Sequence, residues 1–250
     1  MNNITIQQFE LVYNSLSFGI AAMGAATLFL WLSRSMVATA YRTAVTISGL
    51  VTAIAFYHYV RIFDSWVAFG TSGGAVPFNE AYRYVDWLLT VPLLVAELVL
   101  VLKLDKKLES TLIKRNVVYA FLMIATGYVG EMTNITSVDL ASPRTIWGAI
   151  SSVFFVLILR DLFGGIDASI KKQSKDIQGI FKILRVVLIA TWGVYPIAYL
   201  LPAIAGNLGL TAQDGLVLKQ IGYTVADILA KPGYGLLIWK IATLKNGSSK

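Results

Sequence analysis

Apolar residues run through this chain in long blocks that are separated by short polar segments. A helix needs about 20 apolar residues to cross the roughly 30 Å hydrocarbon core of a bilayer. The blocks that reach this length lie near residues 11–33, 43–63, 82–104, 116–137, 144–164, 181–205 and 217–243. The pattern therefore predicts an all-α membrane protein, a bundle of seven transmembrane helices formed by a single domain over residues 1–250.

The composition supports a membrane as the solvent. Hydrophobic residues make up 56% of the 250 residues and charged residues only 14%, whereas soluble domains carry about 25% charged residues. The chain has no Cys and one His, His58, which excludes disulfides, Cys-ligated metal centres and multi-histidine metal sites. We expect a multi-pass protein of the cell membrane.

The basic residues indicate how the helices are oriented, because Lys and Arg concentrate in short cytoplasmic loops. Sixteen of the 21 Lys and Arg residues fall on the side of the predicted C-terminus and four on the other side, with Lys231 inside the last helix. We therefore expect the N-terminus outside and the C-terminus in the cytoplasm. The net charge of +7 then reflects topology. We expect the lipid bilayer, and not nucleic acid, as a partner of the chain, and binding of lipid headgroups by the basic loops is a secondary alternative.

Two polar segments are longer than the others. Residues 64–80 carry Gly-Gly between apolar runs, a pattern that permits an outer β-hairpin between the second and third helices. Residues 165–180 form a polar, basic cytoplasmic link. Neither segment is large enough to form a ligand-binding domain outside the membrane.

Ionisable residues inside a membrane span are costly and by default mark a functional site. Lys231 lies near the middle of the last predicted helix, and Asp227 lies four residues earlier on the same face. One interpretation is a structural ion pair that fixes helix packing. The other is a lysine that forms a Schiff base with a carbonyl cofactor, because desolvation favours the neutral, nucleophilic amine. Asp227 would then help to neutralise the protonated imine.

The third predicted helix carries a second set of polar residues. Asp86 and Glu97 are 11 residues apart, which places them on nearly the same face and roughly 16 Å apart along the axis. Thr90 lies between them on that face, and Arg83 lies almost one turn outside Asp86. Two carboxyl groups with a cation between them would form a proton path. The alternative is that both groups only bond to neighbouring helices.

His58 lies on the second predicted helix. A single His in a membrane helix is often a packing residue whose ring bonds to a backbone carbonyl. The functional alternative is a hydrogen bond to Asp86 that tunes the protonation of that carboxyl.

The sixth predicted helix carries an aromatic stripe of Trp192, Tyr195 and Tyr199, with Pro196 among them. Pro196 implies a kink, because proline removes a backbone hydrogen bond. Such a stripe often only packs a core. Together with Trp87 of the third helix, these rings could instead enclose a long, flat polyene.

Three motifs make the chain resemble a known family across essentially its full length. They are RYVDWLLTVPLLVAE on the third predicted helix, WGVYP on the sixth and DILAKPGYG on the seventh. Their combination is similar to that of the microbial (type I) rhodopsins. The resemblance implies all-trans retinal bound to Lys231 as a protonated Schiff base.

The same resemblance implies roles for the other residues. Asp86 matches the primary counterion and proton acceptor, and Asp227 matches the second counterion. Glu97 matches the cytoplasmic proton donor, and Arg83 the arginine that couples the counterions to the outer half-channel. The residues that match the retinal pocket are Tyr59, Trp87, Met123, Trp192, Tyr195 and Pro196, with Tyr199 where some relatives carry Trp.

The set of Asp86, Thr90 and Glu97 resembles the proteorhodopsin and xanthorhodopsin branch of outward proton pumps. Chloride pumps of the family lack the first Asp, sodium pumps carry Asn, Asp and Gln, and sensory members usually lack the donor carboxyl. His58 matches the histidine that this branch pairs with its counterion. Leu94 stands where green-absorbing forms have Leu and blue-absorbing forms have Gln.

Two further positions bear on finer properties. Lys219 occupies the place on the seventh helix where archaeal pumps carry an outer glutamate, which argues against early proton release through a glutamate pair there.

Gly148 follows Trp147 on the fifth helix, where many relatives have a bulky residue. A Gly here opens a window for a carotenoid antenna in the xanthorhodopsin group, so we expect a hydroxylated carotenoid as a second chromophore. The alternative is a small residue that only serves helix contact.

Together these expectations describe a light-driven outward proton pump, not an enzyme, and we expect a homo-oligomer. Two alternatives stay open. One is a photosensor that signals through a partner, which Glu97 disfavours. The other is a retinal-free receptor or transporter with a structural Lys–Asp pair. A G-protein-coupled receptor is disfavoured because the chain has no outer disulfide and no DRY or NPxxY motif.

Overall fold

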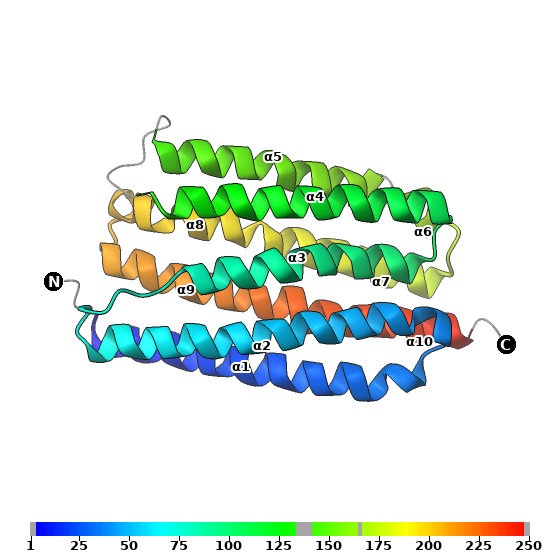
Figure 1. Ribbon diagram of the computed structural model, residues 1–250, viewed down its shortest axis with the longest axis horizontal. Coiled ribbons are helices and arrows are strands. Elements are labelled where there is room, and N and C mark those ends of the chain that lie inside the picture. The colour runs from blue at the N-terminus through cyan, green and yellow to red at the C-terminus, as the bar shows by residue number, and fades with distance from the viewer. Residues whose placement is uncertain (1–3, 134–141, 165–166, 248–250) are drawn as a thin grey trace.

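The computed structural model describes residues 4–133, 142–164 and 167–247. Within these ranges all regular structure is helical. The long helices lie side by side along one common axis, as Figure 1 shows. This arrangement agrees with the predicted all-α class.

The described residues form seven rods, which confirms the predicted number of helices. The first five rods are α1 (Ile6–Ser33), α2 (Arg42–Thr71), α3 (Ala81–Leu102), α4 (Lys106–Glu131) and α5 (Pro143–Gly164). The sixth is α7 (Lys175–Trp192) continued by α8 (Val194–Ile204), and the seventh joins α9 (Ala212–Ile228), a π turn η4 (Leu229–Gly233) and α10 (Tyr234–Gly247). The short connecting helices are η1 (Arg34–Met36), η2 (Thr39–Tyr41), α6 (Asp167–Ile170) and η3 (Ala205–Leu208).

Six of the rods are long and apolar enough to cross a membrane by their length and composition. The seventh rod runs beside them over the length of the bundle (Figure 1), although it carries the buried charges Lys219, Asp227 and Lys231. The chain is therefore a multi-pass membrane protein. We name the end at which α1 begins the outer end, following the predicted orientation, which stays a prediction.

The first and seventh rods begin with the same capping motif. Thr5 and Gln8 form a capping box at the start of α1, and Thr211 and Asp214 form another at the start of α9. Each box satisfies backbone N–H groups that a helix start leaves without partners. The Gln8 side chain also donates to Oδ1 of Asp214 at 2.7 Å. The two rods therefore begin together at the outer end.

The β-hairpin predicted over residues 64–80 is wrong. α2 continues to Thr71, and no strand forms in the remainder of this segment, all of which the structure describes. The apolar residues serve the helix instead, because Trp66 is fully buried in the core beside α1. Gly73 and Gly74 then take φ values of 61° and 84°, which turn the chain directly after the helix.

Helix ends differ from the predicted spans mainly where polar residues extend a rod. α4 begins at Lys106, well before the predicted residue 116, because charged side chains prolong a helix beyond the hydrocarbon. Residues 134–137 of that predicted span lie outside the described residues. α7 begins at Lys175, inside the predicted cytoplasmic link, of which residues 165–166 also lie outside them.

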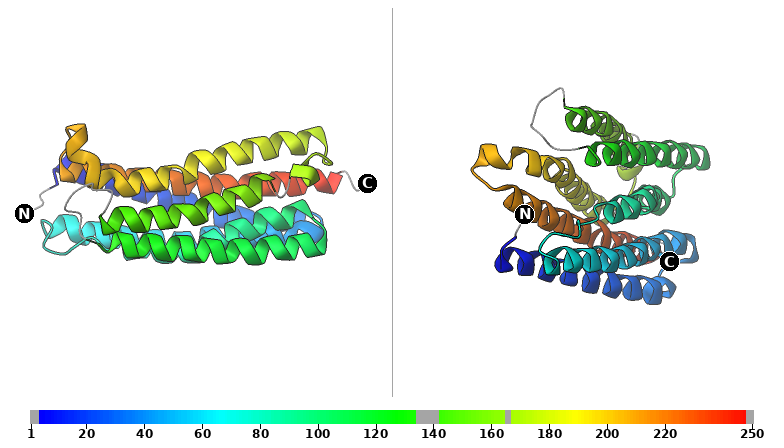
Figure 2. Two further views of the ribbon diagram at one scale, coloured as in Figure 1. Left: turned by 90° about the horizontal axis from the view of Figure 1, so that it is seen from above. Right: turned by 60° about the vertical axis from the view of Figure 1, so that its left-hand side comes forward.

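The rods pack side by side around buried polar and charged side chains. Each of the first five rods packs on its neighbour in sequence, α8 packs on α9, and α9 packs back on α1. Figure 2 shows the rods side by side in two further views. Large apolar side chains such as Leu32, Phe18 and Ile197 point outward and are more than 60% exposed. An apolar surface around buried charges is what a bilayer requires.

Candidate functional site

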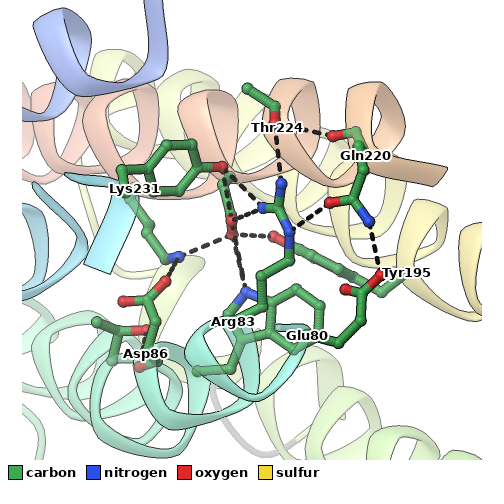
Figure 3. A network of polar contacts seen from close by, with 11 residues as sticks. Glu80, Arg83, Asp86, Tyr195, Gln220, Thr224 and Lys231 are labelled. Atoms are coloured by element: carbon green, nitrogen blue, oxygen red, sulfur yellow. Dashed lines mark hydrogen bonds and ion pairs between the residues drawn. The ribbon is translucent and has the colours of Figure 1, made fainter. Parts of the chain in front are cut away.

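Lys231 lies in the π turn η4, in the middle of the seventh rod. Pro232 follows it, and a proline inside an α-helix lacks the N–H for the ladder and collides with the carbonyl one turn earlier. The wider π turn accommodates this proline without ending the rod, and such turns are frequent at functional sites. The Lys231 side chain is buried and reaches toward Asp86 of α3, as Figure 3 shows.

The amine of Lys231 lies between two buried carboxylates. Its Nζ is 2.6 Å from Oδ2 of Asp86 and 2.7 Å from Oδ1 of Asp227. Both aspartates are fully buried. Burial of charged groups is costly even where they are paired, so we infer that these three residues have a function beyond helix packing. The structure thus brings the predicted lysine and both predicted counterions into one contact.

The two aspartates differ in how firmly they are held. Asp227 accepts hydrogen bonds from Tyr59 Oη at 2.8 Å, Trp87 Nε1 at 3.1 Å and Tyr195 Oη at 2.7 Å, each from a different rod. The carboxyl of Asp86 accepts from Lys231 through its Oδ2, and within the described chain its buried Oδ1 has no hydrogen-bond partner. Asp86 therefore keeps an oxygen that is free to take a proton, whereas Asp227 does not.

Arg83 closes the site on its outer side. Its Nη1 lies 3.6 Å from Oδ2 of Asp227. The other nitrogens of the fully buried guanidinium donate to Gln220 Oε1 at 3.0 Å and to Thr224 Oγ1 at 3.3 Å (Figure 3). With Lys231, Arg83 balances the two aspartates, so the buried group is electrically neutral.

Glu97 is a separate buried carboxyl on α3, away from the Lys231 triad. Ser48 Oγ donates to its Oε2 at 2.7 Å, and its Oε1 has no partner in the part of the chain that the structure describes. Thr90, between Glu97 and Asp86, donates to the backbone oxygen of Asp86 at 2.8 Å and not to either carboxyl. Glu97 is thus an isolated buried acid on the cytoplasmic half of the predicted path.

The predicted hydrogen bond between His58 and Asp86 does not form between these described residues. The Nδ1 of His58 lies 2.9 Å from the backbone oxygen of Ile54, one turn earlier on α2. The ring bonds to this carbonyl because a helix presents it within reach of the side chain. This backbone contact is the one expected of a packing residue, and a functional role for His58 stays a prediction.

An apolar cavity extends from Lys231 between α3, α4 and α5 on one side and α7, α8 and α9 on the other. Its empty space is roughly 800 Å³, part of which opens to the surface. The predicted pocket residues that line it are Trp87, Leu94, Met123, Gly148, Trp192, Tyr195, Pro196 and Tyr199. Tyr59 is not among its lining residues and instead bonds to Asp227. A long apolar carbonyl compound attached to Lys231 fits this chemistry.

Gly148 lies on the cavity wall against the ring of Tyr199. A Cβ atom at this position would lie 3.0 Å from Cε1 of Tyr199, closer than ordinary contact. Tyr199 is fixed in place, because its Oη donates to the backbone oxygen of Arg144 at 2.9 Å and its own backbone oxygen accepts from Arg144 Nη2 at 2.7 Å. The absence of a side chain at Gly148 therefore lets Tyr199 lie against α5.

Lys219 was singled out from the sequence, but the polar and charged residues around it near the outer end were not. We name this group the outer cluster; its members are Glu80, Glu131, Arg144, Lys219 and Gln220. Their contacts join α3, α4, α5 and α9. Opposite charges at the outer ends of neighbouring spans were a signal in the sequence. Their burial depends on how the helix ends meet, which one sequence does not give.

Comparison with known proteins places the chain in a family. Residues 11–245 match the family model described as bacteriorhodopsin-like protein. The green-light absorbing proteorhodopsin of Gamma-proteobacterium EBAC31A08 is 31% identical over 240 residues, which cover 95% of this chain and 89% of that protein. The bacteriorhodopsin of Halobacterium salinarum is 31% identical over 230 residues, covering 89% and 80%.

A solved structure also matches the chain, with higher sequence identity. The crystal structure of xanthorhodopsin, described as a light-driven ion pump with dual chromophore, matches with a TM-score of 0.89 and 42% sequence identity. The match covers 98% of this chain and 97% of that one. Together with the family model, which spans nearly the whole bundle, these similarities show that the chain belongs to the bacteriorhodopsin-like family.

Proposed function

We propose that the protein is a light-driven pump that moves protons outward across the cell membrane. The observation that carries this proposal is the amine of Lys231, placed between Asp86 and Asp227 at the end of an apolar cavity. The second support is Glu97, a buried acid on the same face of the same helix as Asp86. The family relationship to proteorhodopsin and bacteriorhodopsin agrees with this function.

All-trans retinal, bound to Nζ of Lys231, would supply the absorption of visible light and an isomerisation that drives the cycle. Trp87, Trp192 and Tyr195 would hold its chain between their rings, because all three line the cavity beside Lys231. Trp87 and Trp192 are themselves buried, which limits the contact of water with this end of the cavity.

The first proton transfer leads from Nζ of Lys231 to Asp86. Their contact of 2.6 Å is within the range of a direct transfer. Asp86 has a free oxygen, whereas Asp227 is occupied by donors from α2, α3 and α8. Asp86 therefore receives the proton, and Asp227 stays ionised and anchors Arg83.

The second transfer restores the proton from the opposite side. Glu97 lies toward the cytoplasm in the predicted orientation, and its burial keeps its proton from bulk water. The Ser48 hydroxyl holds one oxygen and leaves the other free. Glu97 gives its proton to Nζ of Lys231, in the middle of the membrane, and takes another from the cytoplasm, so each cycle moves one proton outward.

Illumination of cells that express the chain with added retinal tests the proposal. We expect the external medium to acidify in the light and the acidification to vanish with a protonophore. A coloured protein that changes no external pH would favour a photosensor. A protein that forms no visible band with retinal would favour the retinal-free receptor or transporter.

We also propose that a hydroxylated carotenoid binds beside Gly148 as an antenna. The support is a half-buried Gly148 and an exposed Pro196 on opposite walls of a cavity that opens to the surface. The similarity to xanthorhodopsin, which is described as carrying a dual chromophore, agrees with this. An action spectrum of pumping should gain a structured blue band when the carotenoid is added. If several carotenoids add no such band, Gly148 only serves helix packing.

A further inference from the structure

The outer cluster lies directly outward of Arg83 and has no part in the transfers described so far. Its centre is Lys219 of α9, whose Nζ is 2.7 Å from Oε1 of Glu80 and 3.0 Å from Oε1 of Glu131. Glu80 stands at the start of α3 and Glu131 at the end of α4. The side chains of Lys219 and Glu131 are 4% and 7% exposed, and that of Glu80 is 18% exposed. Glu80 is thus the most exposed of these three side chains, although its Oε2 atom is buried.

The two carboxylates of the cluster are not equivalent. Glu131 uses both oxygens, because Oε1 faces Lys219 while Oε2 accepts from Arg144 Nη2 at 3.1 Å and Tyr84 Oη at 3.2 Å. Glu80 uses only Oε1, and its Oε2 is buried without a partner among the residues that the structure describes. A proton can bind Oε2 of Glu80 without displacing a donor. On Glu131 it would have to displace one.

Gln220 connects this cluster to the site around Lys231. Its Oε1 accepts from Nε of Arg83 at 3.0 Å, and its Nε2 donates to Oε1 of Glu80 at 2.7 Å (Figure 3). Gln220 is fully buried, so no water competes for the two ends of its amide. Arg83 pairs with Asp227. A change of charge at the site around Lys231 therefore acts on Glu80 through the side chains of Arg83 and Gln220.

We propose that Glu80 is the group that releases the transported proton at the outer end, with Lys219 and Gln220 as its positioning residues. This inference rests on the proposed function. The O–H bond of protonated Asp86 breaks, the proton passes outward, and an O–H bond forms at Oε2 of Glu80. That bond then breaks as the proton passes to outer water, and no electrons are transferred.

The charges of the cluster favour this release. With Glu80 ionised, Lys219 and Arg144 balance the two glutamates. With Glu80 protonated, Lys219 and Arg144 are balanced by Glu131 alone. The cluster then carries one net positive charge, which favours loss of the proton from Glu80. The contacts at Oε1 of Glu80 can persist in both states. The charged and titratable groups that face Glu80 are Arg83 and Tyr84 of α3, Lys219 and Tyr223 of α9 and, across Lys219, Glu131 of α4.

The test follows proton release after a single flash, with the full-length, retinal-loaded protein in nanodiscs and a pH-sensitive dye in the medium. Unmodified protein should release a proton before it takes one up, and infrared difference spectra should contain a carboxyl band of Glu80. Glu80→Gln should lose the early release and the band, and Glu80→Asp should regain the release. The matched control Glu131→Gln should keep both signals. Early release that survives in Glu80→Gln but is lost in Glu131→Gln would overturn the proposal, as would unmodified protein in which release follows uptake.

A second measurement separates this inference from the proposed function. If the unmodified protein moves no protons in light, the proposed function is wrong, and Glu80 can still be examined without light. In carbon-13 NMR of the retinal-free protein with labelled Glu, Gln220→Leu should shift the carboxyl signal of Glu80, whose Oε1 accepts from Gln220 Nε2. Glu80→Gln and Glu131→Gln assign the two signals. A Glu80 signal that does not respond to Gln220→Leu would contradict the proposed connection between Arg83 and Glu80.

Discussion

Nζ of Lys231 and Oδ2 of Asp86 lie 2.6 Å apart, although 145 positions of sequence separate the two residues. The contact joins the third rod to the seventh inside a bundle whose surface is apolar. A buried ion pair alone is weak evidence for stability, because desolvation offsets most of its attraction. Its position at the end of a cavity, with a free oxygen on Asp86, is instead what proton transfer requires.

Replacement of Lys231 by Ala should abolish the pigment. Lys231 is the amine that lines the cavity, so no covalent attachment remains for a carbonyl cofactor. The visible absorption spectrum after addition of retinal is the measurement. Lys240→Ala, an exposed lysine on the same rod, is the matched control and should keep its colour. A normal visible band in Lys231→Ala would refute the attachment site.

Asp86→Asn should shift the absorption to the red and stop pumping. The loss of a negative charge beside the cationic amine makes it easier for light to move positive charge along the polyene, and the acceptor of the first transfer is gone. Asp227→Asn should instead reduce pigment formation or stability, because Asp227 binds Tyr59, Trp87 and Tyr195. Continued light-driven acidification by Asp86→Asn would rule out its role as acceptor.

Glu97→Gln should leave the colour nearly unchanged and slow the return of the proton to Lys231. A positioned general acid contributes roughly 100-fold or more to a proton transfer, so we expect a slowing of about this size. Ser48→Ala removes only the hydrogen bond to Oε2 and should have a smaller effect. Flash photolysis measures the decay. An unchanged decay in Glu97→Gln would remove this residue from the path.

Gly148→Trp should abolish carotenoid binding while retinal still binds. The new side chain must displace the ring of Tyr199, because even a Cβ there would lie 3.0 Å from it. Overpacking of this kind typically costs about 1–3 kcal/mol, so a lower melting temperature should accompany the change. Gly148→Ala, which adds only the Cβ, is the milder comparison. A blue antenna band that persists in Gly148→Trp would place the carotenoid elsewhere.

Much of the architecture follows from the sequence, because membrane spans are the strongest pattern that a chain can carry. The charged residues in the middle of spans, Lys231, Asp227 and Asp86, stood out for the same reason. The predicted hairpin failed because the apolar residues of 64–71 satisfy a helix as well as a strand. Only the burial of Trp66 against α1 decides between them.

The details that sequence could not give depend on side-chain direction and on helix ends. The ring of His58 can face Asp86 or its own helix, and a choice of rotamer decides between the two. Glu131 and Arg144 lie near the ends of predicted spans, where charges are usually solvated. Their pairing at 3.1 Å becomes visible only when α4 and α5 are placed side by side.

The most direct test of the central claim is light-driven proton movement in liposomes that contain the retinal-loaded protein in one known orientation. We expect protons to leave the side that holds the C-terminus and to appear on the side that holds the N-terminus, and we expect Asp86→Asn to abolish this movement. A coloured protein that moves no protons, or moves them in the opposite direction, would contradict the claim.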